Sequence, residues 1–152
     1  ILSELRYSKG IGIDISKKAI EVANRNLKTF KLSNKIKFLK MSLDQIHSKK
    51  FDLVVSNPPY IMKNDMRNLD DDIKKFEPKL ALDGGNDGLD VIKKVIYKST
   101  KLLKINGILA LEIGNGQFKQ VSKILRNNNF ILKELVKDYQ ENIRCIISTL
   151  KN

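Results

Sequence analysis

The feature that most constrains the fold is a regular alternation between short apolar runs and longer segments with helical spacing. The apolar runs are typical of buried strands and occupy residues 10–14, 36–39, 51–56 and 108–113. Three intervening segments, which start after Ser16, at 89 and at 117, repeat apolar residues every three or four positions, as on one face of a helix. Strands that alternate with helices predict a parallel sheet covered by helices, and therefore an α/β fold.

The C-terminal third departs from this alternation. Two apolar runs, 130–138 and 144–150, are separated only by a short polar turn, which predicts an antiparallel strand pair. The segment 62–86 is long and polar, and we expect a mobile loop that contacts the substrate. A length of 152 residues is that of one domain.

Composition excludes several function classes. A single cysteine, Cys145, and a single histidine, His47, argue against a disulfide, a metal site and a Ser-His-Asp relay. Without an apolar run of roughly 18 residues we expect no membrane partner, and we expect a cytoplasmic setting. The net charge of +12 is compatible with an anionic partner such as RNA, although the scattered lysines equally fit solvated faces.

Polar residues fall at or near the predicted carboxyl ends of three strands. These residues are Asp14, Asn57 and Glu112, and parallel sheets bind ligands beyond those ends. A carboxylate accepts hydrogen bonds from both hydroxyls of a vicinal diol, so Asp14 is a candidate for binding the ribose of a nucleotide-type cofactor. The alternative is an ordinary surface aspartate. We expect Glu112 to shape this edge rather than to act as a base.

The run Asn57-Pro58-Pro59-Tyr60 ends a β-branched strand and carries a specific chemistry. A planar amide or amine nitrogen is a poor nucleophile because its lone pair is delocalised. Acceptors at the Asn57 side chain and the Pro58 backbone carbonyl would bind both N–H groups and direct that lone pair at an electrophile. The prolines restrict the turn, and Tyr60 offers a flat face for a planar group. An ordinary Pro-Pro loop is the alternative.

This run resembles the catalytic motif of S-adenosylmethionine-dependent methyltransferases that modify planar amino groups. The wider pattern, from about Gly10 to the C-terminus, resembles the glutamine methyltransferases of peptide chain release factors. The segments that carry this resemblance are 56–61, Phe76-Glu77-Pro78, 81–85, 87–90, 111–114 and Lys137-Asp138. It implies a Rossmann-like class I methyltransferase sheet that ends in an antiparallel strand pair, with methyl transfer to the N5 nitrogen of a glutamine in a release factor.

The resemblance also implies which residues bind S-adenosylmethionine. Asp14 corresponds to the carboxylate that binds the ribose. Ser42 aligns where the family commonly has an acidic residue for the adenine, and Asp44 is the second candidate for that contact. Asn57 is expected to lie beside the bound cofactor.

For the substrate, the resemblance implies that Asn57 and Pro58 hold the glutamine amide. Pro59 fixes the turn and Tyr60 forms the pocket wall, so all four residues are catalytic or substrate-binding candidates. Glu77 is expected to anchor the substrate loop, with a surface carboxylate as its alternative.

The chain begins at Ile1 and in mid-pattern, so we expect it to be a piece of a longer protein. The family's first strand, its glycine-rich cofactor loop and its N-terminal helical domain would lie before Ile1. Residues 1–152 are therefore interpreted as a partial methyltransferase catalytic domain, which alone binds the cofactor poorly and is inactive.

Two other functions remain open from the sequence. The same chemistry could act on an exocyclic amino group of adenine or guanine in RNA or DNA, which the basic charge favours. The acidic run 70–72 would repel a phosphate backbone and favours a protein substrate. The third alternative is a non-catalytic remnant of such an enzyme.

Overall fold

The computed structural model describes residues 1–47 and 51–151, and internal contacts divide the chain into two compact units, residues 1–47 and 48–152. Both units combine helices with strands, as the alternating pattern predicted. Among the described residues, no helix is long and apolar enough to cross a membrane. The interpretation of 1–152 as one partial catalytic domain stays a prediction.

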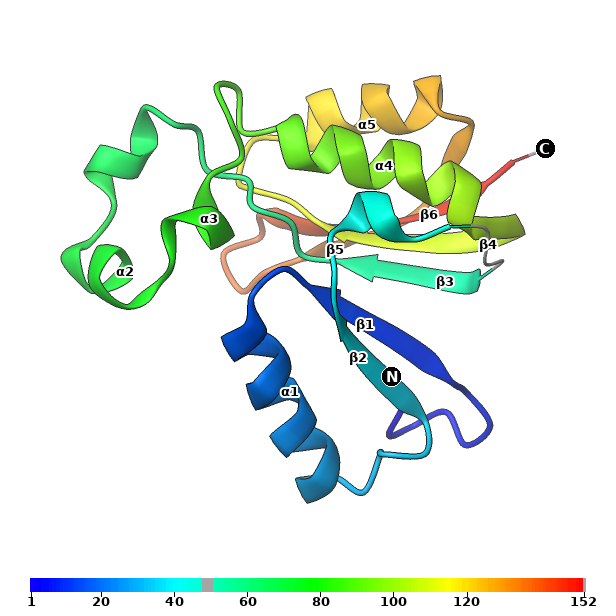
Figure 1. The fold of residues 1–152 in the computed structure, drawn as a ribbon. Helices are drawn as coiled ribbons and strands as arrows, with labels where there is room; N and C mark the ends of the chain where they lie inside the picture. The colour runs from blue at the N-terminus through cyan, green and yellow to red at the C-terminus, as the bar shows by residue number, and fades with distance from the viewer. Residues whose placement is uncertain (48–50, 152) are drawn as a thin grey trace. The chain divides into compact units, whose positions relative to one another are not determined.

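The first unit is a strand–helix–strand arrangement. Strand β1 (Gly10–Asp14) leads into helix α1 (Lys17–Thr29) and then into strand β2 (Ile36–Lys40), which a 3₁₀ turn, η1 (Leu43–Gln45), follows. The two strands pair in parallel, with Asp14 opposite Lys40, and α1 packs along them (Figure 1). The carboxyl ends of β1 and β2 therefore lie together.

Local hydrogen bonds explain the sharp passage from β1 to α1. The Ser16 backbone N–H donates to Asp14 Oδ1 at 2.7 Å, and Ser16 Oγ accepts from the Ala19 N–H at 3.3 Å. Ser16 is thus the N-cap of α1, as the sequence indicated, because its hydroxyl satisfies a first-turn amide.

The second unit is built on a four-stranded sheet. Its strands are β3 (Phe51–Ser56), β4 (Leu103–Glu112), β5 (Phe130–Lys137) and β6 (Ile143–Leu150), in the spatial order β3-β4-β6-β5. Strand β4 pairs with β3 in parallel and with β6 antiparallel, and β5 also pairs antiparallel with β6. The predicted C-terminal antiparallel pair is confirmed.

One face of this sheet forms the core of the second unit. Helices α4 (Asp90–Leu102) and α5 (Phe118–Asn127) lie side by side over it (Figure 1). The side chains that meet there are fully buried and include Ile92, Ile96, Leu109, Leu111, Val121, Leu125 and Ile146. Burial of this apolar surface is the main stabilising contribution to the unit.

The segment 62–86 is more ordered than the sequence indicated. It contains a 3₁₀ turn, η2 (Asp65–Asn68), and two short helices, α2 (Asp71–Phe76) and α3 (Lys79–Leu82). The sequence analysis expected a mobile loop here and did not predict these short helices. Acidic residues in the first turn of α2 and lysines in its last turn complement the helix dipole. Its contact with a substrate stays a prediction.

Strand β4 starts earlier than predicted. It follows α4 at Leu103, whereas Asn106-Gly107 predicted a turn and a strand start at 108. The strand is irregular around these two residues, because its register with β3 jumps from Phe51–Leu103 to Leu53–Ile108 and Asn106 has a φ of 62°.

The arrangement of the core predicts that two leucines of the same sheet contribute very differently to the free energy of unfolding. Leu111 on β4 is fully buried, whereas Leu135 on β5 is 39% exposed. We expect Leu111→Ala to lower the free energy of unfolding of the second unit by about 2–5 kcal/mol, because it leaves a cavity under α4 and α5. Leu135→Ala should lower the free energy of unfolding by much less than Leu111→Ala, because its side chain is partly exposed. Equal costs in urea titrations followed by circular dichroism would contradict this assignment of the core.

Candidate active site

The Asn57–Tyr60 turn begins where β3 ends, at the carboxyl end of its parallel pairing with β4. Asn57 is exposed and Pro58 is buried. Within residues 1–47 and 51–151, neither the Asn57 side chain nor the Pro58 carbonyl has a hydrogen-bond partner. Both acceptors that the sequence singled out are therefore available to a ligand.

Tyr60 is held at both of its ends. Its backbone carbonyl accepts from Gln117 Nε2 at 3.0 Å, and its hydroxyl accepts from an Arg144 guanidinium nitrogen at 2.9 Å. The Arg144 guanidinium carbon lies 5.4 Å from the centroid of the Tyr60 ring. The ring is thereby fixed relative to β6, which carries Arg144.

Glu112 lies beside this pair at the end of β4. Its Oε1 is 3.7 Å from the same Arg144 nitrogen, and both side chains are about one-third exposed. The carboxylate thus neutralises the cation that positions Tyr60. This contact fits the expectation that Glu112 shapes the edge of the sheet.

Three glycines pack closely against Tyr60. A Cβ on Gly84 would lie 2.8 Å from the Tyr60 Cα, one on Gly88 would lie 2.5 Å from the Tyr60 carbonyl oxygen, and one on Gly114 would lie 3.0 Å from the ring. Since no side chain fits at these distances, glycine is required for the turn to approach both neighbouring segments.

Backbone hydrogen bonds join the turn to the segment 82–85. Ile61 N–H donates to the Leu82 carbonyl at 3.0 Å, and Gly84 N–H donates back to the Ile61 carbonyl at 2.9 Å. A further bond of 2.9 Å runs from Lys63 N–H to the Gly85 carbonyl. The glycine-rich segment and the Asn57–Tyr60 turn therefore form one short ladder.

An ion pair anchors the other end of the glycine-rich segment. Lys93 Nζ on α4 lies 2.7 Å from Asp87 Oδ2, while Asp87 Oδ1 accepts from the Leu89 N–H at 2.9 Å. The hydrogen bond from Lys93 lowers the pKa of Asp87 below its usual value. Asp87 is therefore ionised at neutral pH and ties the segment to the start of α4.

Three of the four cofactor candidates, Asp14, Ser42 and Asp44, lie in the first unit, whereas the fourth, Asn57, lies in the second. Asp14 is exposed, and its Oδ2 has no hydrogen-bond partner in the described part of the chain. The Met41 N–H donates to the Asp14 carbonyl at 3.0 Å, which brings Ser42 and Asp44 to the same end of the sheet. One carboxylate oxygen, held in place through the other, suits a ribose hydroxyl.

Glu77 is the candidate with the least structural support. It follows α2, its side chain is exposed, and its backbone N–H donates to the Ile73 carbonyl at 2.9 Å. Its side chain makes no hydrogen bond or ion pair with the described residues. The role of Glu77 as a substrate anchor stays a prediction.

Metal-dependent and thiol chemistry have no visible basis in the described ranges. No group of three or more His, Cys, Asp or Glu side chains there could hold a metal ion. Burial raises the pKa of the Cys145 thiol above its usual value, so the thiol is protonated at neutral pH and weakly nucleophilic.

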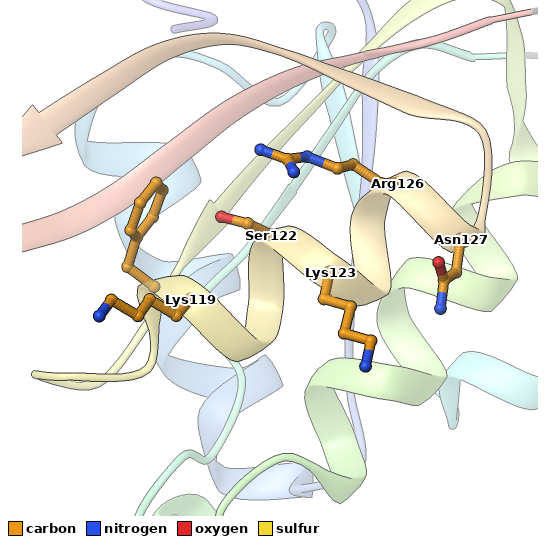
Figure 2. Close-up of a pocket in the computed structure, with 6 residues that line it drawn as sticks. Lys119, Ser122, Lys123, Arg126 and Asn127 are labelled. Carbon is orange, nitrogen blue, oxygen red and sulfur yellow. The ribbon is translucent and has the colours of Figure 1, made fainter.

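A groove lies along α5 and is lined by side chains of that helix (Figure 2). Arg126 extends toward Ser122, whose buried hydroxyl has no hydrogen-bond partner in the part of the chain described. Lys119 and Lys123 extend away from that hydroxyl (Figure 2). Because the cations do not converge, the groove does not form a binding site for a small anion.

Sequence reasoning missed two residues of the site, Gln117 and Arg144. The sequence placed Gln117 at the start of a helix and Arg144 at the start of a strand. In the structure Gln117 is the N-cap of α5 and Arg144 is the second residue of β6. Their contacts with Tyr60 join residues far apart in the sequence, so periodicity and local motifs carry no signal for them. For Gln117, the adjacent segment 111–114 was the nearest indication.

Two glycines with the same backbone handedness provide a matched test of this site. Gly88 has a φ of 71° and is crowded by Tyr60, whereas Gly116 has a φ of 78° and open space around it. Gly116→Ala should cost about 1–2 kcal/mol of stability, from backbone strain alone. We expect Gly88→Ala to cost about 1–3 kcal/mol more, because its methyl group also displaces the Tyr60 carbonyl. Equal losses in thermal unfolding would contradict the packing around Tyr60.

Comparison with known proteins places the chain in a family. A sequence model described as "Eco57I restriction-modification methylase" matches residues 14–143. The chain is 43% identical over 150 residues to the release factor glutamine methyltransferase of Fusobacterium nucleatum, covering 97% of this chain and 42% of that protein. It is 45% identical over 107 residues to the ribosomal protein uL3 glutamine methyltransferase of Francisella tularensis, covering 70% of this chain and 34% of that protein.

Solved structures show the same fold at low sequence identity. A methyltransferase from Pyrococcus furiosus has a TM-score of 0.69 at 14% identity, covering 99% of this chain and 66% of that one. The ribosomal protein L11 methylase of Lactobacillus delbrueckii has a TM-score of 0.65 at 17% identity, covering 95% of this chain and 58% of that one. The predicted Rossmann-like class I methyltransferase fold is thus confirmed.

The chain spans about half or less of the length of the curated relatives it matches. The family model nevertheless covers most of its residues, and the relatives named release factor glutamine methyltransferase align with nearly all of it. The chain therefore belongs to the Eco57I-type methylase family and, among curated proteins, is a relative of the glutamine methyltransferases.

Proposed function

We propose that this chain belongs to an enzyme that transfers a methyl group from S-adenosylmethionine to the side-chain amide nitrogen of a glutamine in a peptide chain release factor. The observation that carries the proposal is the pair of unoccupied acceptors, Asn57 and Pro58, on a turn that backbone and side-chain hydrogen bonds hold in place. Relatives aligned with nearly the whole chain bear the name release factor glutamine methyltransferase.

The chemistry of the amide explains why two fixed acceptors are needed. The Asn57 side-chain carbonyl and the Pro58 carbonyl would each accept from one N–H of the glutamine amide. This grip directs the nitrogen lone pair at the methyl carbon, so that the N–C bond forms as the S–C bond breaks. The methylated amide cation is strongly acidic and loses its proton to water. No side-chain base is required, which suits a Glu112 already paired with Arg144.

S-adenosylmethionine, when bound, supplies the electrophilic methyl group. Asp14 would accept hydrogen bonds from the ribose hydroxyls, and Ser42 or Asp44 would contact the adenine. Support for these roles comes from the free Asp14 oxygen and from the position of all three residues at one end of the β1–β2 sheet.

The substrate would meet the segment between the catalytic turn and α4. Helix α2 begins with Asp71 and Asp72 and is preceded by its N-cap residue Asp70, and all three side chains are exposed. Such a surface suits a basic or neutral protein loop and repels a phosphate backbone. Glu77, which directly follows α2, would anchor that loop.

The proposal extends to the organisation of the enzyme. Residues 1–152 are a partial catalytic domain, and the glycine-rich cofactor loop and a helical domain belong to the rest of the protein. The setting is the cytoplasm, where the release factor substrate acts.

We expect substitution of Asp14 to change the affinity for the cofactor and substitution of Asn57 to change the turnover. In the protein as its gene encodes it, we expect Asp14→Asn to weaken S-adenosylmethionine binding by about 10- to 100-fold, because a charged acceptor is lost while the turn-forming oxygen is kept. Asn57→Ala should leave that affinity unchanged and lower turnover about a hundredfold, as expected for one lost preorganised contact of about 3 kcal/mol.

Calorimetry measures the affinities, and a methyl-transfer assay measures turnover. Wild-type turnover in Asn57→Ala would remove this residue from the mechanism. Unchanged cofactor affinity in Asp14→Asn would contradict a contact between Asp14 and the ribose.

The substrate class is tested by offering three acceptors to the enzyme with radiolabelled cofactor. These are a release factor, the same factor with its target glutamine replaced by alanine, and total RNA. We expect label only in the unaltered factor, because the acceptor pair fits a primary amide and α2 repels phosphate. Label in RNA alone would overturn the proposal in favour of nucleic-acid methylation, and no label in any acceptor would support a non-catalytic remnant.

A further inference from the structure

We infer that Gln117 is the positioning residue that holds the catalytic turn in its reactive geometry. The inference rests on the proposed function, because it concerns the same turn. It assigns to Gln117 no contact with substrate or cofactor. Its effect would pass through the backbone of Tyr60.

A single side-chain amide joins three separate segments. Gln117 Nε2 donates to the Tyr60 carbonyl at 3.0 Å and to the Gly88 carbonyl at 3.2 Å. Gln117 Oε1 accepts from the Gly114 N–H at 2.8 Å. Both amide hydrogens and the amide oxygen are thereby used, and the residue is only 8% exposed.

The chemistry of the three partners requires a primary amide. Two backbone carbonyls face Gln117 and need donors, while one backbone N–H needs an acceptor, and no other neutral side-chain group offers two donors and an acceptor at one end. A carboxylate would keep the acceptor but would face two carbonyl oxygens without a donor. Asparagine is one methylene shorter.

The backbone of Gln117, from which this side chain extends, is held in place by hydrogen bonds. Gln117 is the N-cap of α5, its carbonyl accepts from the Val121 N–H at 3.0 Å, and its own N–H donates to the Gly114 carbonyl at 3.2 Å. Val121 is fully buried, and α5 packs against β5 and α4. The side chain therefore ties the turn to the core of the second unit.

This position predicts a specific kinetic effect. Asn57 and Pro58 lie within three residues of the carbonyl that Gln117 holds, so loss of the contact shifts the acceptors relative to the reacting nitrogen. A displacement of about 1 Å costs about a hundredfold in rate. The residues proposed to bind the ribose and adenine, Asp14, Ser42 and Asp44, lie in the other unit, so we expect their contacts with the cofactor to be unaffected.

The test compares Gln117→Glu with Gln120→Glu in the protein as its gene encodes it. Both substitutions add the same negative charge. Gln120 lies on α5, is exposed and makes no hydrogen bond through its side chain within the described residues, so its variant is the control for the charge alone. We expect Gln117→Glu to lower kcat for a release factor about a hundredfold, with KM for S-adenosylmethionine within twofold of wild type. Gln120→Glu should retain wild-type kcat, and near-wild-type kcat in Gln117→Glu would overturn the inference.

Hydrogen–deuterium exchange provides a readout that does not depend on activity. The amides of Ile61, Lys63 and Gly84 form the ladder that Gln117 holds, whereas those of Leu109 and Leu111 lie in the centre of the sheet. We expect Gln117→Glu to accelerate exchange at the first three alone. Unchanged exchange there, or equal acceleration at all five, would contradict a positioning role.

The two proposals fail in distinguishable ways. If the wild-type enzyme methylates no release factor, the proposed function fails and the exchange pattern alone decides on Gln117. If Gln117→Glu does not fold, Gln117→Met, which adds no charge, takes its place in both measurements. Loss of the fold in both variants would overturn the inference, because the side chain would then be needed for the core rather than for the turn.

Discussion

The parallel pairing of β3 with β4 is the interaction on which the site depends. Its register sets Ser56 opposite Leu111, so the chain leaves β3 for the catalytic turn where β4 is about to end. Strand β6, antiparallel to β4, then brings Arg144 to the same edge, next to Glu112. The pairings of β3 and of β6 with β4 thus position side chains that the sequence separates widely, and the buried face under α4 and α5 stabilises both pairings.

The site combines rigidity with unsatisfied polar groups. Tyr60 is fixed through its carbonyl, its hydroxyl and the glycines around it, while Asn57, three residues earlier, is exposed with its amide free. An acceptor that is held in place without a partner needs little reorganisation when a substrate arrives. The surrounding hydrogen bonds thus restrict the conformation of the turn more than its two prolines alone would.

Most of the fold was predictable because it is encoded locally. Apolar periodicity located the strands and long helices, and Ser16 and Asn57 marked a helix start and a strand end through their own chemistry. The helices of segment 62–86 were missed because they are too short for a periodic signal. The early start of β4 was missed because Asn106-Gly107 is typical of a turn. Gln117 and Arg144 were missed because their partners lie far away in the sequence, where only the folded chain brings them close.

The pairing of β3 also has a consequence for how the chain acquires its structure. The pairing of β5 with β6 closes a short loop, whereas residue 53 must find residue 108 across the whole intervening segment. Because loop closure costs more entropy as the loop lengthens, we expect the C-terminal strands to assemble early and β3 to join late. The Asn57–Tyr60 turn, which directly follows β3, would then be among the last parts to take its native shape.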